Sequence, residues 1–203
     1  MKKFELLTTD TKDLFGRKLF RIRALRDFGN VKAGELGGYV EKEGNLSHDG
    51  NAWVYNDAKI YGNAWVCDYA KICGNAEIYD NAWIYGGAWV YNDAKIYGNA
   101  RVCNYAEIYG DAKIYGNARV CNYAVISGDA DYLCFKGLGS FNRNTTFFKC
   151  KDGSIGVTCG CFSGSLVEFQ AKVKETHGDN KYAREYLKAV EVVKIHFDLE
   201  ESE

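Results

Sequence analysis

The chain has 203 residues, a formal net charge of −1 and no proline. This length has room for a repeat structure and one small domain, and the near-neutral charge gives no electrostatic reason to expect a nucleic-acid or membrane partner. No apolar run of about eighteen residues is present, and Met1-Lys2-Lys3 leads into Phe4-Glu5 rather than into a hydrophobic signal core. We therefore expect a cytoplasmic protein.

Residues 1–43 precede a repeat and are predicted to form a β-hairpin cap. Residues 4–8 and 18–25 are the predicted strands, because charged and apolar side chains alternate from Lys18 to Ala24, as in a sheet with one solvated face. Residues 10–12 are expected between the two strands, and glycine-rich residues 34–39 are expected to be a loop that enters the repeat. Such a cap would cover the open end of a solenoid.

Residues 44–132 form a six-residue repeat with almost no interruptions. Alanine recurs every six residues from Ala52 to Ala130, and Val or Ile follows two residues later from Val54 to Ile126. Because side chains alternate along a strand, each repeat places both residues on the same side of a short strand. Gly, Asn and Asp, which tolerate turn conformations, stand between the strands.

The repeat also predicts three strands per coil. Tyr91–Ile108 reads YNDAKIYGNARVCNYAEI, and the next eighteen residues, Tyr109–Ile126, read YGDAKIYGNARVCNYAVI. We predict about five triangular coils with a dry interior of Ala, Val and Ile. The pattern resembles the left-handed parallel β-helix of hexapeptide-repeat proteins, as in Ile96-Tyr97-Gly98-Asn99-Ala100-Arg101. The left-handed winding of the coils is implied by this resemblance alone, because crossover connections between parallel strands are usually right-handed.

The outward positions of the coils are rich in aromatic residues and arginine. The candidate binding residues fall on three faces, and they are Tyr61, Tyr79, Tyr97 and Tyr115; Trp65, Trp83, Arg101 and Arg119; and Trp53 with Trp89. Trp, Tyr and Arg dominate interface hot spots, and an Arg one coil from Trp83 is placed for a cation–π contact. The open interpretations are tyrosine ladders that only stabilise the solenoid, self-association through one face, and binding of a foreign ligand.

Residues 133–203 are predicted to form a small α+β domain. The expected strands are 132–136, 145–149 and 154–161, with a turn at 151–153. Ser165 and Glu168 form a capping box that begins a helix to about residue 176, and a second helix is expected at 181–195. We expect the acidic tail at 200–203 to be disordered.

The eight cysteines are expected to be reduced thiols, because no secretion signal accompanies them. Cys67, Cys103 and Cys121 are expected to share an outward column. Cys159-Gly160-Cys161 could ligate zinc, but Val157, Cys159 and Cys161 alternate as a strand facing a small core would, and one CxC pair is a weak metal signal. We expect no metal and no cofactor.

Hexapeptide-repeat β-helices include acyltransferases and γ-class carbonic anhydrases, and this resemblance implies enzymes that use histidine as a base or as a zinc ligand. No histidine occurs between Asp49 and Thr176, and no inserted loop breaks the repeat. His48 is expected at the cap junction and His177 at a helix end. An acyltransferase-like enzyme is therefore the weakest alternative.

The whole chain also resembles uncharacterised proteins encoded by phages and prophages. The resemblance rests on Leu19–Leu25 with Gly37–Glu43, on the repeats, and on Cys159–Phe162 with Lys174–Lys181. It implies action in the cytoplasm of an infected bacterium. We expect a non-catalytic protein that forms a homo-oligomer, either a dimer or a trimer. We expect it to bind a host protein, such as a component of a defence system. The expected binding surface is formed by the aromatic faces or by the C-terminal domain. The alternative is a small-ligand or nucleotide-signal binder, a sponge with pockets between subunits.

Overall fold

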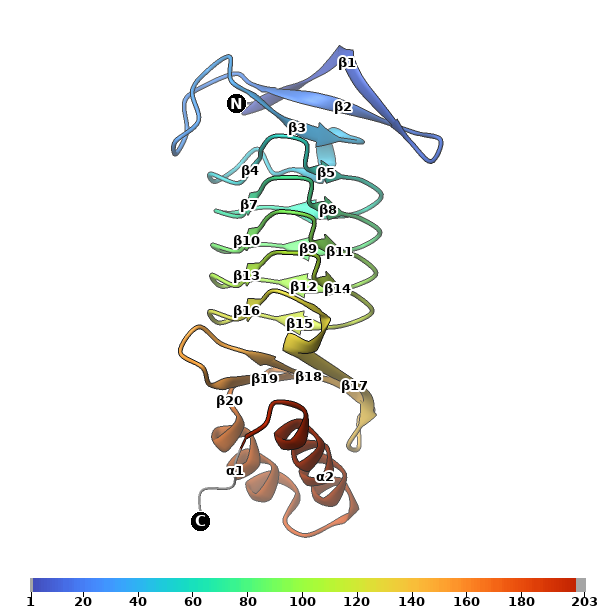
Figure 1. The fold of residues 1–203 in the computed structure, drawn as a ribbon, viewed down its shortest axis with the longest axis vertical. Helices are drawn as coiled ribbons and strands as arrows, with labels where there is room; N and C mark the ends of the chain where they lie inside the picture. The colour runs from blue at the N-terminus through green and yellow to red at the C-terminus, as the bar shows by residue number, and fades with distance from the viewer. Residues whose placement is uncertain (1, 200–203) are drawn as a thin grey trace.

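The computed structural model describes residues 2–199 and shows an elongated β-solenoid with a β-hairpin at one end and a sheet with two helices at the other (Figure 1). The predicted mainly β fold is confirmed. Met1 and the acidic tail at 200–203 lie outside the described residues. None of the helices in the described part of the chain is long and apolar enough to cross a membrane.

Each full coil of the solenoid contributes one two-residue strand to each of three sheets, and the strands of successive coils pair in parallel. The tyrosine face contains β5 (Lys59–Ile60), β8 (Glu77–Ile78), β11 (Lys95–Ile96) and β14 (Lys113–Ile114). The tryptophan–arginine face contains β6 (Trp65–Val66), β9 (Trp83–Ile84), β12 (Arg101–Val102) and β15 (Arg119–Val120). The third face contains β4 (Trp53–Val54), β7 (Lys71–Ile72), β10 (Trp89–Val90), β13 (Glu107–Ile108) and β16 (Val125–Ile126). Paired residues are eighteen apart, as Lys95 and Lys113 are, which is the predicted length of a coil.

Alanine, valine and isoleucine fill the interior of the prism, as predicted. Ala100 and Ile96, for example, are fully buried. Between strands the chain turns through residues with positive φ, such as Gly62 (68°) and Asn92 (59°), which explains the Gly, Asn and Asp between strands.

The N-terminal cap consists of β1 (Phe4–Leu14), β2 (Arg17–Ala24) and β3 (Leu36–Val40). Two expectations were wrong here: residues 10–12 belong to β1, and residues 34–39 contain β3 rather than only a loop. β3 pairs antiparallel with β2 and parallel with β5, so it joins the hairpin to the tyrosine face. Gly38 permits this close approach, because a Cβ there would lie 2.6 Å from the Ala58 carbonyl oxygen. The parallel partner of β3 is β5, which belongs to the first coil and reaches β3 only in the folded structure. The sequence of residues 34–39 by itself therefore indicated a loop.

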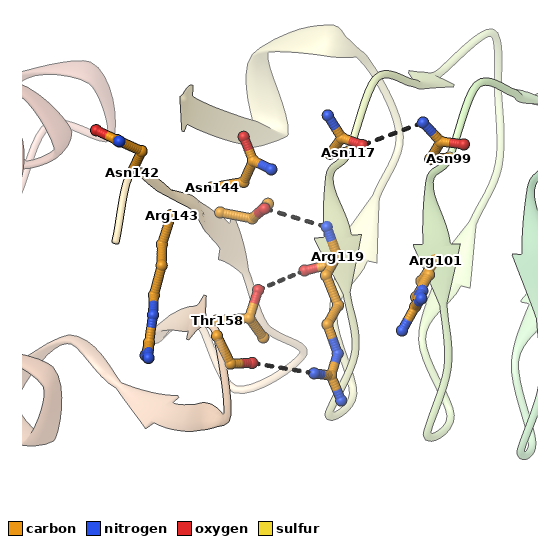
Figure 2. A pocket seen from close by; sticks show the side chains of 10 residues that line it. Asn99, Arg101, Asn117, Arg119, Asn142, Arg143, Asn144 and Thr158 are labelled. Atoms are coloured by element: carbon orange, nitrogen blue, oxygen red, sulfur yellow. Dashed lines mark hydrogen bonds between the residues drawn. The ribbon is translucent and has the colours of Figure 1, made fainter. Parts of the chain in front are cut away.

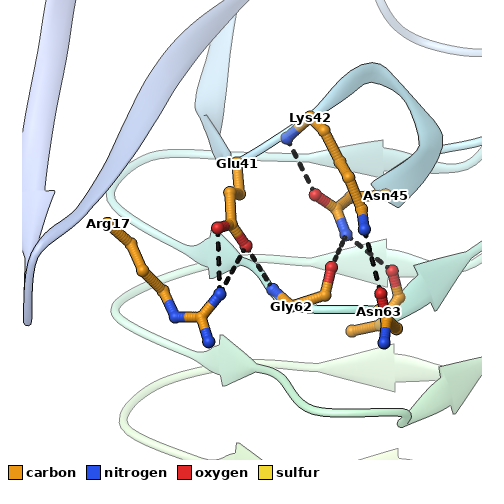
Figure 3. Close-up of polar contacts among 7 residues, drawn as sticks. Arg17, Glu41, Lys42, Asn45, Gly62 and Asn63 are labelled. Atoms are coloured by element: carbon orange, nitrogen blue, oxygen red, sulfur yellow. Dashed lines mark hydrogen bonds and ion pairs between the residues drawn. The ribbon is translucent and has the colours of Figure 1, made fainter.

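Polar contacts join the cap to the first coil next to a short 3₁₀ helix, Glu43–Asn45 (Figure 3). Glu41 accepts a hydrogen bond from the Gly62 amide and forms a 2.9 Å ion pair with Arg17 of β2. The Asn45 side chain accepts from the Lys42 amide at 2.9 Å and donates to the Gly62 carbonyl at 3.2 Å. These contacts satisfy main-chain groups of the first coil and its approach, for which no preceding coil provides hydrogen-bond partners.

A 3₁₀ turn, Asp129–Asp131, leads from the solenoid to the antiparallel sheet β17 (Tyr132–Leu138), β18 (Arg143–Lys149), β19 (Ile155–Cys159) and β20 (Phe162–Ser165). Phe148 of β18 belongs to the solenoid core, whereas Phe147 packs against Phe169 of the first helix. Because neighbouring residues of a strand point to opposite faces, one sheet both closes the solenoid and supports the helices.

The helices are α1 (Leu166–His177) and α2 (Lys181–His196), close to the predicted bounds. The predicted capping box is confirmed, since the Glu168 amide donates to the Ser165 hydroxyl at 3.2 Å while the Glu168 carboxylate accepts from the Ser165 amide. One strand was missed: residues 154–161 contain β19 and then a turn into β20. Cys161 is therefore exposed in that turn, not on the core side with Val157 and Cys159.

Candidate functional site

Two of the ten predicted binding residues lie inside the protein. Trp53 is fully buried under the cap, with its ring 5.3 Å from that of Phe28 and 6.3 Å from that of Phe4. Tyr61 is buried against Leu19 and Tyr39. The prediction that both rings are available as binding residues is therefore wrong. The repeat places them outward, but the cap folds over the first coil and covers them.

The remaining tyrosines of the first column form a ladder along the tyrosine face. The rings of Tyr79 and Tyr97 are 4.9 Å apart and parallel, and Tyr115 stacks on Tyr97 at 5.3 Å. Each ring covers much of its neighbour, and Tyr115, at the end of the ladder, is exposed. Such stacking stabilises neighbouring coils by about 0.5–1.5 kcal/mol for each pair. This column is consistent with the interpretation that the tyrosine ladder stabilises the solenoid.

On the tryptophan–arginine face, the predicted contacts between coils are present. The Trp65 and Trp83 rings stack at 5.3 Å, and the guanidinium of Arg101 lies 5.3 Å from the centre of the Trp83 ring. Trp65, at the end of this row, is 42% exposed. Trp65 is therefore the more exposed of the two tryptophans on this face.

Cys67, Cys103 and Cys121 do not belong to the apolar interior of the prism, in keeping with the predicted outward column, but the three thiols are buried rather than exposed. The strand residues beside them, including Arg119, are long enough to cover the small sulfur atoms. Hydrogen bonds from Cys121 and Tyr85, together with the charge of Arg119, lower the pKa of the Cys103 thiol. The structure contains these cysteines as free thiols.

The turns between the tryptophan–arginine face and the third face carry tyrosines that the sequence analysis missed. Tyr69, Tyr105 and Tyr123 follow Asp or Asn in these turns and are 62%, 60% and 59% exposed. Together with Trp65, which precedes Tyr69 in one coil, and Trp89 (44% exposed) on the third face, we call them the aromatic corner. The available signal was Asp-Tyr or Asn-Tyr at spacings of thirty-six and eighteen residues.

Tyr105 and Tyr123 have unusual backbone conformations. Their φ angles are +63° and +60°, and the preceding residues, Asn104 and Asn122, also have positive φ. Two successive left-handed residues favour Asn followed by Gly, and a left-handed L-residue with a large side chain costs about 1–2 kcal/mol. Stacking between the two rings, which are 5.5 Å apart, offsets part of this cost.

A groove of about 440 Å³ runs beside the aromatic corner. Its walls include Tyr69, Trp89, Tyr105 and Lys71, and Asn51 and the loop at Gly29-Asn30 close one end. Gly87 lies beneath the Tyr105 ring, where a Cβ would collide with ring carbons. The absence of a side chain at Gly87 therefore lets Tyr105 lie across the corner and leaves the groove open.

Arg101 and Arg119 line a second cleft, of about 370 Å³, at the end of the tryptophan–arginine face (Figure 2). The opposite wall comes from the C-terminal sheet and contains Arg143, Asn142 and Asn144. Sequence reasoning missed this wall because it forms only when the sheet docks on the last coil.

The histidines lie outside the linings of the groove and the cleft. His48 lies at the cap junction, as predicted, where it stacks on Phe4 at 4.5 Å and contacts Glu43 at 2.6 Å. His177 ends α1, as predicted, and stacks on Tyr186 at 5.8 Å. Among residues 2–199, no three His, Cys, Asp or Glu side chains come together as metal ligands would.

Comparison with known proteins supports the repeat but does not extend over the chain. Residues 112–128, which contain β14, β15 and β16, match the family described as YdcK Beta solenoid repeat. A search of curated proteins found no significant match. The chain is thus similar, over one coil, to a family of β-solenoid repeats.

Proposed function

We propose that this chain is a non-catalytic binding protein that engages a protein partner through the aromatic corner. The observation that carries the proposal is the conformation of Tyr105 and Tyr123, whose exposed rings stand on left-handed backbone. Strain of this kind persists where the surrounding structure and a function require it. In a partner complex, burial of the rings would supply the favourable contact that solvent does not.

The shape and chemistry of the corner suit a protein surface. Tyr69, Trp89 and Tyr105 line one groove, and Tyr123 stacks on Tyr105, so these large rings lie together rather than as isolated apolar residues. Aromatic side chains contribute most to interface hot spots, because they bury much area with few rotatable bonds. Lys71 beside Trp89 favours a partner with an acidic group next to its apolar contact.

The residues that line the groove and the cleft support a non-catalytic role. Neither lining contains His, Cys, Asp or Glu, the side chains that most often act as acid, base or nucleophile near neutral pH. In keeping with the phage resemblance, we propose that the partner is a protein of the infected bacterial cell and that this chain acts in its cytoplasm as a dimer or trimer.

A photo-crosslinking amino acid at position 105 tests the proposal in the native cellular background. The expected result is a covalent adduct with one other polypeptide, identified by mass spectrometry, that excess wild-type protein suppresses. The matched control is the same amino acid at Phe15, an exposed ring at the tip of the β1–β2 hairpin. Adducts only between copies of this chain would contradict a foreign partner, and equal adducts at position 15 would contradict a specific corner.

Light scattering of the purified protein tests the oligomeric state separately. A dimer or trimer is expected. A monomeric mass at about 100 μM would contradict self-association, since stable interfaces between subunits normally persist at such concentrations. Trp65→Ala and Trp89→Ala then show whether self-association hides the corner. A drop in mass in either variant would assign the corner to contact between copies.

A further inference from the structure

The arginine cleft lies on a different part of the molecule from the aromatic-corner groove, and the two linings share no residue. One wall comes from the last two coils of the tryptophan–arginine face, and the other comes from β18, the loop before it and the turn after β19 (Figure 2). The side chains of Arg101, Arg119 and Arg143 all extend toward the same side of the view, with Arg119 between the other two (Figure 2). The cleft thus concentrates positive charge.

None of the three guanidinium groups forms an ion pair with a carboxylate in the described part of the chain, and the ionisable groups beside Arg119 include the buried Cys103 thiol. The ion pairs that arginines form within residues 2–199 involve Arg17, Arg21 and Arg23, all in the N-terminal cap. No residue that lines the cleft is acidic. Uncompensated like charges repel one another, and a bound anion would relieve that repulsion.

Contacts with neighbouring residues hold the arginines in place without using all their donors. Arg119 donates from Nη1 to the Gly160 carbonyl at 3.4 Å, while its Nε is buried and has no partner. The Thr146 hydroxyl accepts from the Arg119 amide at 3.1 Å, and the Thr158 hydroxyl donates to the Arg119 carbonyl at 2.7 Å. These bonds hold β15 against the C-terminal sheet, so the backbone that carries the Arg119 side chain is fixed in position.

The two outer arginines are supported by aromatic rings. Arg101 lies over Trp83 at 5.3 Å, and Arg143 lies over Phe141 at 5.1 Å. Stacking fixes the plane of a guanidinium while its edge keeps donors for a ligand. All three arginines are therefore preorganised in part, which lowers the entropy cost of binding.

Amide side chains complete the lining. Asn99 donates to Asn117 at 3.2 Å on the solenoid wall, and Asn142 and Asn144 stand on the opposite wall. Amides offer both donors and acceptors, as hydroxyl groups of a ligand require. The lining contains no aromatic ring, and aromatic rings are one of the main surfaces on which nucleobases stack.

We infer that this cleft binds a small organic phosphate with a hydroxyl-rich body, such as a sugar phosphate. The phosphate contacts the guanidinium groups, which match its oxygens in bidentate geometry, and the asparagines contact the hydroxyl groups. A volume of about 370 Å³ is within the range of small-molecule sites. This inference does not depend on the protein-binding proposal, because different residues carry each.

Isothermal titration calorimetry with ribose 5-phosphate, inorganic phosphate and ribose tests the inference on the full chain. We expect ribose 5-phosphate to bind most tightly, inorganic phosphate at least about tenfold more weakly, and ribose not at all. Raising the salt concentration should weaken binding of both phosphates. Failure of both phosphates to bind, or equal binding of ribose, would overturn the inference.

Variants then assign the binding to the cleft. Arg101→Gln and Arg143→Gln should each weaken ribose 5-phosphate binding by about tenfold or more, because each removes a charge-assisted contact. The control is Lys113→Gln, which removes an exposed cation on the tyrosine face and should change the affinity less than about twofold. Circular dichroism identifies variants that fold normally. If folded Arg101→Gln and Arg143→Gln bind as the wild type does, the cleft is not the site.

Discussion

The ammonium group of Lys3 donates a 2.8 Å hydrogen bond to the carbonyl of Ala52 and lies 5.0 Å from the centre of the Phe28 ring. In later coils, such a carbonyl accepts from the strand one coil earlier, as the Ala70 carbonyl accepts from Trp53. The first coil has no earlier neighbour, so Lys3 supplies the missing donor. The other two alanine carbonyls of the first coil, those of Ala58 and Ala64, accept from the Tyr39 amide and the Asn45 side chain.

Lys3 predicts a rise in stability at alkaline pH. Burial, helped by the charge of Arg26, lowers its pKa from 10.5 to about 8. Between these values the unfolded chain binds more protons at Lys3 than the folded one does, so Lys3 should contribute a rise of roughly 2 kcal/mol to the free energy of unfolding from pH 8 toward pH 10. Groups whose pKa burial raises, such as the Cys67 thiol and the Tyr61 hydroxyl, contribute with the opposite sign, because the folded chain keeps their protons longer.

Urea unfolding at several pH values measures this effect, with Lys3→Met as the comparison. The variant should be less stable at every pH, because the Ala52 carbonyl loses its donor, at a cost of about 1–3 kcal/mol. It should also lack the contribution of Lys3 between pH 8 and 10, so the stability difference between wild type and variant should grow by roughly 2 kcal/mol across this interval. The thiols and tyrosines are common to both proteins and cancel in this difference. A difference that stays constant or shrinks from pH 8 to pH 10 would contradict the assignment to Lys3.

Trp53 and Trp65 should differ sharply on truncation, although they occupy equivalent positions in their repeats. Trp53→Ala removes a ring enclosed by Phe4 and Phe28 and should lower the free energy of unfolding by about 3–5 kcal/mol. Trp65→Ala loses mainly one stacked pair with Trp83, about 1 kcal/mol. Chemical denaturation of the two variants decides the matter, and equal losses would show that the cap does not enclose Trp53.

Asp131 should stabilise the junction between the solenoid and the C-terminal sheet at neutral pH. Burial alone would raise its pKa, but hydrogen bonds from Lys149 and Ser127 lower it from 3.8 to about 2. This contribution is present above pH 3.8 and is lost as the pH falls to 2.

Asp131→Asn should therefore cost about 2 kcal/mol at pH 7 and almost nothing at pH 2. Asp111→Asn, a change at an exposed carboxylate, is the control and should have little effect at either pH. Thermal unfolding of both variants at the two pH values measures the difference. A loss that is the same at pH 2 and pH 7 would show that the charge of Asp131 is not responsible.

The cysteines should separate into fast and slow classes toward a thiol reagent. Cys161 is exposed in the β19–β20 turn and should be labelled first in the folded protein. Cys103 is fully buried, and burial should protect it although its pKa is lowered. Mass spectrometry after timed labelling with iodoacetamide identifies each site. Labelling of Cys103 as fast as that of Cys161 would show that the tryptophan–arginine face opens readily.

The repeat by itself determined the solenoid, because the period of six residues specifies both the side chains that fill the prism and the positions where it turns. Ile96 and Ala100 face the interior, and Gly62 and Asn92 turn the chain, for reasons that operate within one coil and its neighbours. The helix boundaries were equally local, since Ser165 caps α1 through its own side chain. These features required no knowledge of distant contacts.

Only the tertiary structure decided which outward residues meet solvent. Trp53 and Trp65 have the same place in the repeat, but the cap covers one and leaves the other exposed. Arg119 was visible in the sequence, whereas Arg143 joins it only because Phe148 and Thr146 dock the C-terminal sheet on the last coil. A repeat specifies the contacts between successive coils. The two ends of the solenoid are covered by segments that do not repeat, so the contacts of these segments could not be predicted from the period of the sequence.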